Sequence, residues 1–147
     1  AKVGDVAKRI TTIEKPFICM INGVTAGAGV NLMLSCDLIY ATAKAKFAQS
    51  FAKVGLIPDC GGLYFLPKAC GVHKAKELMF TADLIDAATA EKIGMLNHVC
   101  AEEELCAQSV RIIIRNIGII TVPAPRLSVV RLHNLALAHM FFAIRYA

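Results

Sequence analysis

The sequence predicts an α/β fold, because short apolar runs alternate with helical patterns along most of its length. The clearest strand is Phe17–Ile21, a run of apolar residues typical of a strand that is covered on both faces. Residues 28–36 follow; they are small or apolar on every side, which predicts a buried helix. With 147 residues, the chain is long enough to form one domain with a real hydrophobic core.

Other elements follow from local signals. Residues 6–14 form the end of a helix that stops before Lys15-Pro16, since proline disfavours helix at the residue before it. Strands are expected at residues 37–41, 46–48 and 95–99. One helix is expected at residues 60–68, with Asp59 at its start, and another at 73–80. A third begins at an Asp86 cap and runs to residue 93, before Gly94. A further helix at 102–115 has an apolar stripe formed by Cys106, Val110, Ile113 and Ile114.

The C-terminal part is less regular, and we divide the chain into an α/β core at residues 1–115 and an atypical helical segment at 116–147. Residues 132–144 are strongly apolar but fall short of the roughly 20 residues that a membrane span needs. They predict a helix that is buried or lies in an interface.

Composition limits the partners. A hydrophobic share of 56% is high for an independent soluble monomer, so either an oligomer buries much of the surface or the chain is part of something larger. The net charge of +5 favours an anionic partner, but the lysines are scattered and do not interleave with aromatic residues as in a nucleic-acid groove. A small polyanionic ligand therefore fits better than nucleic acid, with a generic solvated basic face as the alternative.

The six cysteines form no CxxC pair, and the four histidines do not complete a zinc spacing, so no metal site is expected. No signal peptide is visible. Reduced thiols in a cytoplasmic or organelle-matrix environment are the expected state.

Two glycine-rich turns are the best candidates for a site. The first contains Gly27, Ala28 and Gly29, but Leu32 stands where a dinucleotide-binding motif needs glycine, and a P-loop lysine is missing. A helix start with small residues remains, where free N–H groups favour negative charge and a carbonyl oxygen can approach closely. The alternative is tight packing of a buried helix against a strand.

The second turn, residues 54–62, contains Asp59 as a lone carboxylate among apolar and glycine residues. An aspartate before a helix is most often an N-cap, and that role is compatible with chemistry. Desolvation by Phe51, Leu56 and Ile57 would suit the carboxylate to act as a general base.

A series of short motifs runs through the chain in a fixed order. They are Lys15-Pro16, Ile21-Asn22-Gly23, Gly27-Ala28-Gly29, Ser35-Cys36-Asp37-Leu38, Phe47-Ala48-Gln49, residues 55–62, Leu66-Pro67, residues 81–87 and residues 93–97. Together they resemble the enoyl-CoA hydratase/isomerase (crotonase) family over about residues 10–105. The resemblance implies a spiral of ββα units, here without its N-terminal part and last C-terminal helices. It also implies an acyl-CoA substrate, no cofactor besides the coenzyme A of that substrate, a homotrimer or hexamer, and neither nucleic acid nor membrane as partner.

The family holds its thioester oxygen with two backbone N–H groups, and Ala28 matches the second donor. The first donor matches a segment upstream of this chain. Two glutamates handle water in the hydratases, and their positions here are Asn31 and Phe51, so hydration is not expected. Asp59 matches the aspartate that dienoyl-CoA and phenylacetate-pathway isomerases use for proton transfer. The surrounding residues look most like the 2-(1,2-epoxy-1,2-dihydrophenyl)acetyl-CoA isomerase type.

The resemblance therefore implies an acyl-CoA thioester isomerase, of the double-bond-shift or epoxide-to-oxepin type. Asp59 and Ala28 are its expected catalytic residues, and the expected substrate-binding residues are Gly27, Gly29, Asn31, Phe51 and Gly62. The alternatives are a catalytically inactive family fragment or scaffold subunit, an enoyl-CoA hydratase, and a membrane-associated protein.

Overall fold

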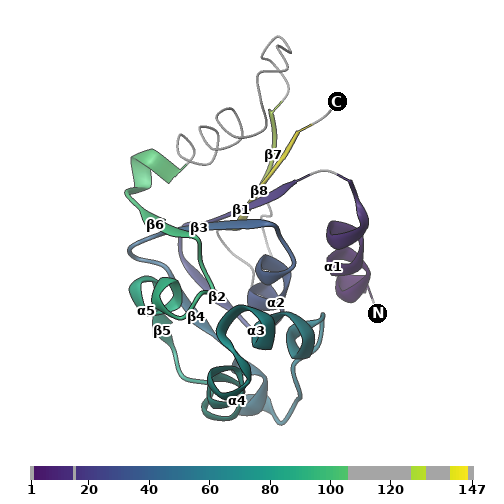
Figure 1. Ribbon diagram of the computed structural model, residues 1–147, viewed down its shortest axis with the longest axis vertical. Helices are drawn as coiled ribbons and strands as arrows, with labels where there is room; N and C mark the ends of the chain where they lie inside the picture. The colour runs from purple at the N-terminus through teal and green to yellow at the C-terminus, as the bar shows by residue number, and fades with distance from the viewer. Residues whose placement is uncertain (1, 15, 106–126, 132–139, 146–147) are drawn as a thin grey trace.

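The computed structural model describes residues 2–14, 16–105, 127–131 and 140–145, and it has the mixed α/β architecture that the sequence predicts (Figure 1). The helices are α1 (Lys2–Thr12), α2 (Ala28–Leu34), α3 (Gly62–Cys70), α4 (Val72–Thr81) and α5 (Ala87–Lys92), with short 3-10 turns η1 (Ser50–Val54) and η2 (Glu102–Glu104). The strands are β1 (Phe17–Ile21), β2 (Val24–Ala26), β3 (Leu38–Thr42), β4 (Lys46–Ala48), β5 (Ile85–Asp86), β6 (His98–Cys100), β7 (Leu127–Arg131) and β8 (Met140–Arg145).

The strands form two sheets. The larger has the order β6-β3-β1-β8-β7, with β1, β3 and β6 parallel and β8 antiparallel to both β1 and β7. The smaller has the order β2-β4-β5. Successive strand pairs divide between the two, since β1 and β3 enter the large sheet while β2 and β4 enter the small one. This repeated crossing places the turns after β2 and β4 close together, because β2 and β4 are parallel neighbours.

β1 is covered on both faces, as its continuous apolar sequence predicts. Phe17, Cys19 and Ile21 belong to the main core, whereas Ile18 and Met20 belong to a second cluster that also contains Tyr40, Cys100 and Leu105. The alternation follows the two-residue period of a strand. All five residues of β1 are buried.

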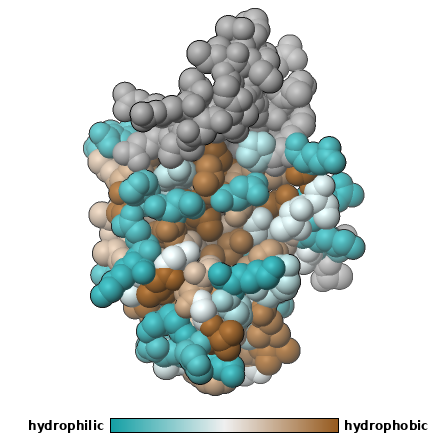
Figure 2. Space-filling view, in the orientation of Figure 1, coloured by the Kyte–Doolittle hydropathy of each residue, from teal (hydrophilic) through white to brown (hydrophobic). Residues whose placement is uncertain are grey.

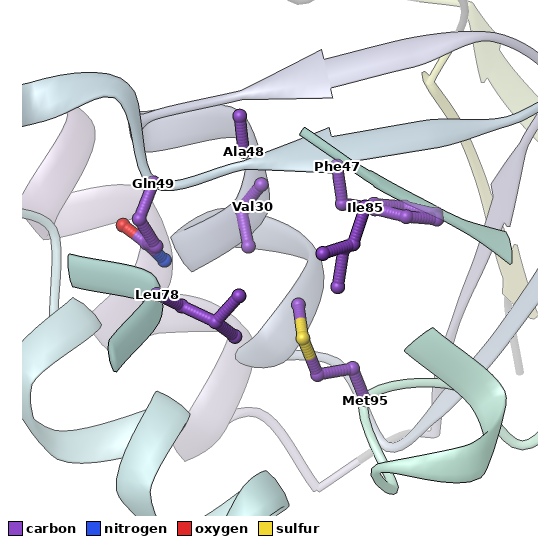
Figure 3. A pocket seen from close by; sticks show the side chains of 7 residues that line it. All are labelled: Val30, Phe47, Ala48, Gln49, Leu78, Ile85 and Met95. Atoms are coloured by element: carbon purple, nitrogen blue, oxygen red, sulfur yellow. The ribbon is translucent and has the colours of Figure 1, made fainter. Parts of the chain in front are cut away.

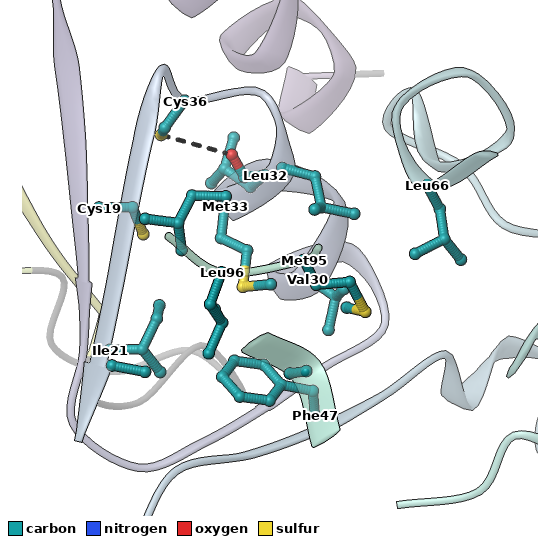
Figure 4. Packing of buried hydrophobic residues seen from close by; sticks show 14 of the residues in the cluster. Cys19, Ile21, Val30, Leu32, Met33, Cys36, Phe47, Leu66, Met95 and Leu96 are labelled. Atoms are coloured by element: carbon teal, nitrogen blue, oxygen red, sulfur yellow. Dashed lines mark hydrogen bonds between the residues drawn. The ribbon is translucent and has the colours of Figure 1, made fainter. Parts of the chain in front are cut away.

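The buried helix α2 lies at the centre of the main core (Figure 4). Val30, Leu32 and Met33 are at most 3% exposed, and the side chains around them come from β1, β4, α3 and the segment before β6. The Cys36 thiol closes the end of the helix by donating to the Leu32 carbonyl oxygen at 3.7 Å. The prediction of a buried helix here is confirmed. The position of α2 matters for the site, because the helix begins in the first glycine-rich turn and contacts the second one through Asn31.

Most of the other predicted elements are confirmed with shifted ends. Asp86 caps α5, with its Oδ1 accepting from the Thr89 N–H at 2.8 Å. The strand expected at 95–99 is shorter and later, as β6 occupies only His98–Cys100. The apolar stripe of the helix expected at 102–115 lies outside the described residues.

The helix expected at residues 132–144 is wrong for residues 140–144, because strand β8 lies there and pairs with every residue of β1. A short apolar run cannot be assigned to a buried helix or a buried strand by periodicity alone, and here the open edge of β1 supplies backbone partners. β7 likewise replaces helix within the segment 116–147. Residues 132–139 lie outside the described part, and the division at residue 115 stays a prediction.

The surface carries many large apolar side chains, and Figure 2 shows apolar patches among polar ones on the viewed face. Val54, Ile57 and Phe80 are each at least 70% exposed. Within the described part of the chain, no helix combines the length and the apolar character that crossing a membrane requires.

Candidate functional site

The first turn of α2 is shaped by Gly27, which has a φ of 55°. A Cβ at this position would lie 3.2 Å from Ser50 Oγ and 3.6 Å from the Phe51 ring, so the close approach of η1 also favours glycine. The Gly27 N–H donates to the Ala48 carbonyl at 2.8 Å, and its own carbonyl accepts from Val30 and Asn31. The N–H of Ala28 is therefore one of the donors at a helix start that have no acceptor within the helix. Ala28 is half-buried, whereas Gly27 and Gly29 are buried.

Asp59 begins a tight turn and does not cap a helix. Cys60 and Gly61 both have positive φ, at 48° and 83°, and the Gly62 N–H closes the turn onto the Asp59 carbonyl at 2.8 Å. Positive φ at both central residues is typical of a type I′ turn. Helix α3 starts only at Gly62, with Gly61 as its N-cap and no capping side chain. The N-cap role expected for Asp59 is thus wrong, and its exposed carboxylate is not used to start the helix.

The apolar neighbours expected to desolvate Asp59 do not enclose it. Leu56 and Ile57 are 61% and 76% exposed, and Phe51 is turned into the interior. Gly55, with a φ of 70°, ends η1 and directs the following residues onto the surface. Any enclosure of the carboxylate must therefore come from groups other than these three.

Two buried amides connect α2 to the Asp59 turn. Asn31 Nδ2 donates to the Asp59 carbonyl oxygen at 2.8 Å, and Gln49 Nε2 donates to Asn31 Oδ1 at 2.7 Å. Asn31 is fully buried and Gln49 is 2% exposed. The structure thereby brings the two predicted turns together, with Ala28 one helical turn before Asn31.

The predicted substrate-binding residues fall on the inside of this arrangement. Gly62 is buried because it packs directly on the Asn31 amide, and a Cβ at position 62 would lie 2.3 Å from Asn31 Nδ2. Phe51 packs near Gly27 and is 8% exposed. A substrate contact by Asn31, Phe51, Gly62 or the two flanking glycines stays a prediction. Gln49 is not among the predicted site residues, because no spacing rule reports which amides become buried.

Cys60 lies beside the Asp59 carboxylate. Burial, together with the hydrogen bond to Asp59 and its negative charge, raises the pKa of the Cys60 thiol from its usual 9.0 to about 11. The thiol is therefore protonated near neutral pH and is a poor nucleophile.

We expect Cys60 to react slowly with iodoacetamide, and its reactivity to report on Asp59. With a pKa of about 11, roughly 1% of the thiol is ionised at pH 9, against about half for an ordinary cysteine. Asp59→Asn removes the negative charge, so the rate of Cys60 alkylation at pH 9 should rise. Peptide mass spectrometry separates Cys60 from the other cysteines. Asp83→Asn, which changes another exposed aspartate, should leave the rate unchanged; equal rates in wild type and Asp59→Asn would contradict the expectation.

A small apolar gap lies beside α2 and is too narrow to admit a water molecule (Figure 3). It is lined by Val30, Phe47, Ala48, Gln49, Leu78, Ile85 and Met95. Asp59 is not part of its wall. The gap is a packing feature of the core and does not form the substrate site.

Among the described residues, no three histidine, cysteine, aspartate or glutamate side chains are grouped so that they could hold a metal ion. His98 instead pairs with Glu91, with 3.1 Å between Nδ1 and Oε1. The chemistry that the described site can carry is that of a carboxylate and backbone N–H groups.

Comparison with known proteins agrees with the resemblance seen in the sequence. Residues 1–122 match the family model described as enoyl-CoA hydratase/isomerase. The 1,2-epoxyphenylacetyl-CoA isomerase of Escherichia coli K12 is 42% identical over 98 residues, which cover 67% of this chain and 37% of that protein.

Solved structures give the same result for the fold. A probable enoyl-CoA hydratase/isomerase from Mycobacterium abscessus superposes with a TM-score of 0.72 at 32% identity, over 75% of this chain and 42% of the other. A putative enoyl-CoA hydratase from Thermobifida fusca, in complex with acetoacetyl-CoA, has a TM-score of 0.64 at 35% identity, over 65% of this chain and 38% of the other. The chain thus has the crotonase fold. It spans less than half the length of these relatives. It belongs to the enoyl-CoA hydratase/isomerase family.

Proposed function

We propose that this chain carries the acid/base half of an acyl-CoA thioester isomerase, in which Asp59 moves the proton. The observation that carries the proposal is the exposed Asp59 carboxylate, whose backbone is bound to α2 by Asn31 at 2.8 Å. The Ala28 N–H, one helical turn before Asn31, is the proposed donor to the thioester oxygen. A base and an oxyanion donor on adjoining turns suit proton transfer next to a carbonyl.

For a double-bond shift, the reaction needs one carboxylate and no water. Asp59 takes a proton from the carbon next to the thioester carbonyl, and negative charge moves onto the thioester oxygen as an enolate forms. The Ala28 N–H and a second donor stabilise that charge. The protonated Asp59 then returns its proton to the far carbon of the allylic system, which shifts the double bond and regenerates the carboxylate. An epoxide-to-oxepin isomerisation is the other reaction of this class that the proposal includes.

Isomerisation is favoured over hydration by what occupies the two positions that match the hydratase glutamates. Asn31 and Phe51 are both buried and neither is a carboxylate, so they cannot activate a water molecule. The similarity to a 1,2-epoxyphenylacetyl-CoA isomerase supports the same choice.

The assembly and location are also proposals. The exposed apolar side chains of the described surface support a homotrimer or hexamer, because association would bury them. We propose a cytoplasmic or organelle-matrix location, in keeping with the free cysteines Cys19, Cys36, Cys60, Cys70 and Cys100.

Isothermal titration with acetoacetyl-CoA tests the proposal, since a T. fusca relative was solved in complex with this compound. We expect saturable binding that is tighter than that of coenzyme A alone, followed by conversion of 3-enoyl-CoA to 2-enoyl-CoA in an absorbance assay. A folded chain that binds no acyl-CoA would support the inactive fragment or scaffold instead. Binding with hydration but no isomerisation would support a hydratase.

A further inference from the structure

We propose that Asn31 and Gln49 are positioning residues for Asp59, forming a buried amide clamp that fixes the backbone of the acid/base residue. The inference rests on the proposed function and deepens it, because it gives the position matched by a hydratase glutamate a different task. Asn31 donates to the Asp59 carbonyl oxygen at 2.8 Å, and Gln49 donates to Asn31 at 2.7 Å. We call these two side chains the amide clamp.

The direction of the clamp follows from elementary hydrogen bonding. The Asp59 carbonyl can only accept, so Asn31 must present its NH₂ group to it. The Asn31 oxygen then faces Gln49, which must present its own NH₂ group. This leaves the Gln49 oxygen buried without a hydrogen-bond partner among the described residues. A buried polar atom without a partner is unfavourable and rare. Its presence here indicates that the free energy gained by orienting Asn31 exceeds the cost of leaving the Gln49 oxygen unpaired.

The turn is built to receive this contact. The Asp59 carbonyl accepts from two donors, the Asn31 amide and the Gly62 N–H, each at 2.8 Å. Gly62 leaves space for the amide, since a Cβ there would lie 2.3 Å from Asn31 Nδ2. The same carbonyl thus both closes the turn and connects it to α2. Together the two contacts hold Asp59 while its carboxylate stays exposed.

Because of the clamp, a hydratase site and the proposed isomerase site cannot share the same residue at position 31. A carboxylate at position 31 has only acceptor atoms when ionised, and one of them would face the Asp59 carbonyl. Asn31→Glu should therefore loosen the Asp59 turn and should not convert this site into a hydratase. The choice between asparagine and glutamate at position 31 would then decide whether the Asp59 turn is held.

Asn31→Asp and Gln49→Met test the clamp in the full chain. The first keeps the shape of the side chain but removes the donor to Asp59, and the second removes the donor that orients Asn31. Ser35→Ala is the matched control, because it deletes a buried hydrogen bond of α2, from Ser35 Oγ to the Leu32 carbonyl at 2.6 Å, away from the turn. Circular dichroism establishes that each variant is folded.

Two readouts do not depend on activity. We expect hydrogen exchange of the Gly62 amide, followed by NMR, to become several-fold faster in both clamp variants. Cys60 alkylation at pH 9 should become several-fold faster in Gln49→Met, which adds no charge beside the thiol. Ser35→Ala should change neither rate. Unchanged rates in a folded Asn31→Asp and a folded Gln49→Met would overturn the clamp.

Kinetics separate positioning from substrate contact. In both clamp variants we expect the kcat for isomerisation to fall at least tenfold. The KM and the Kd for acetoacetyl-CoA should stay within about twofold of wild type. A raised KM with unchanged kcat would overturn the proposal, because it would make Asn31 a substrate contact. If the wild-type chain is inactive but both exchange and alkylation respond, the clamp stands and the proposed function fails.

Discussion

Asp59→Asn is expected to lower kcat/KM for isomerisation of 3-enoyl-CoA by about 10²–10⁴-fold, the usual contribution of a general acid/base. The amide cannot take up the proton, and the described part of the site offers no second carboxylate at positions 31 or 51. The effect should be on kcat, because the exposed side chain does not shape the fold. The measurement is the rate of 2-enoyl-CoA formation, alongside the thermal unfolding temperature.

Asp83→Asn is the matched control, since Asp83 is also an exposed aspartate but lies after α4 and outside the site. It should keep wild-type activity. The role of Asp59 is wrong if the folded Asp59→Asn variant isomerises its substrate at more than about a tenth of the wild-type rate, given the range expected for acid/base loss.

Ala28→Pro is expected to lower kcat for isomerisation by about 10²–10³-fold, the usual effect of losing one oxyanion-hole donor. Proline removes the N–H, and it is well tolerated at the first residue of a helix, where that N–H has no partner within the helix. Gly27, with φ 55° and ψ −123°, lies outside the helical conformation that a following proline disfavours. The variant should therefore fold, and its activity and its affinity for acetoacetyl-CoA should fall together.

Ala28→Ser provides the comparison, because it keeps the N–H and adds a single oxygen at a half-buried position. Its kcat should stay close to that of wild type. If Ala28→Pro folds and is as active as Ala28→Ser, the oxyanion donor must lie elsewhere.

The sequence predicted the parts of the fold that depend on neighbouring residues. β1 was predicted because an uninterrupted apolar run suits a strand covered on both faces, and the structure divides its residues between two clusters. Asp86 was predicted as a cap because the bond to Thr89 spans three residues. The motifs also placed the chain in its family, whose model it matches.

What the sequence could not predict depends on contacts between distant segments. Asn31 and Gln49 lie 18 residues apart, and Asn31 and Asp59 lie 28 apart, so no local pattern indicates that they meet. The structure starts α3 later than the sequence predicts, because Cys60, a residue not usually found at positive φ, joins Gly61 in the turn before it. The sequence predicts a helix where β8 lies, because the apolar residues there carry no period that excludes either element.

The pairing of β1 with β8 has a consequence for how the sheet assembles. Phe17 pairs with Ile144, so nearly the whole chain lies between the partners, and closing so long a loop must precede the contacts that stabilise it. As the chain leaves the ribosome, β3 can join one edge of β1 early, while the other edge has no β8 until residues 140–145 emerge. An apolar strand with one open edge is prone to pair with another chain. β8 therefore protects an edge of β1, a strand that leaves the ribosome much earlier than β8 does.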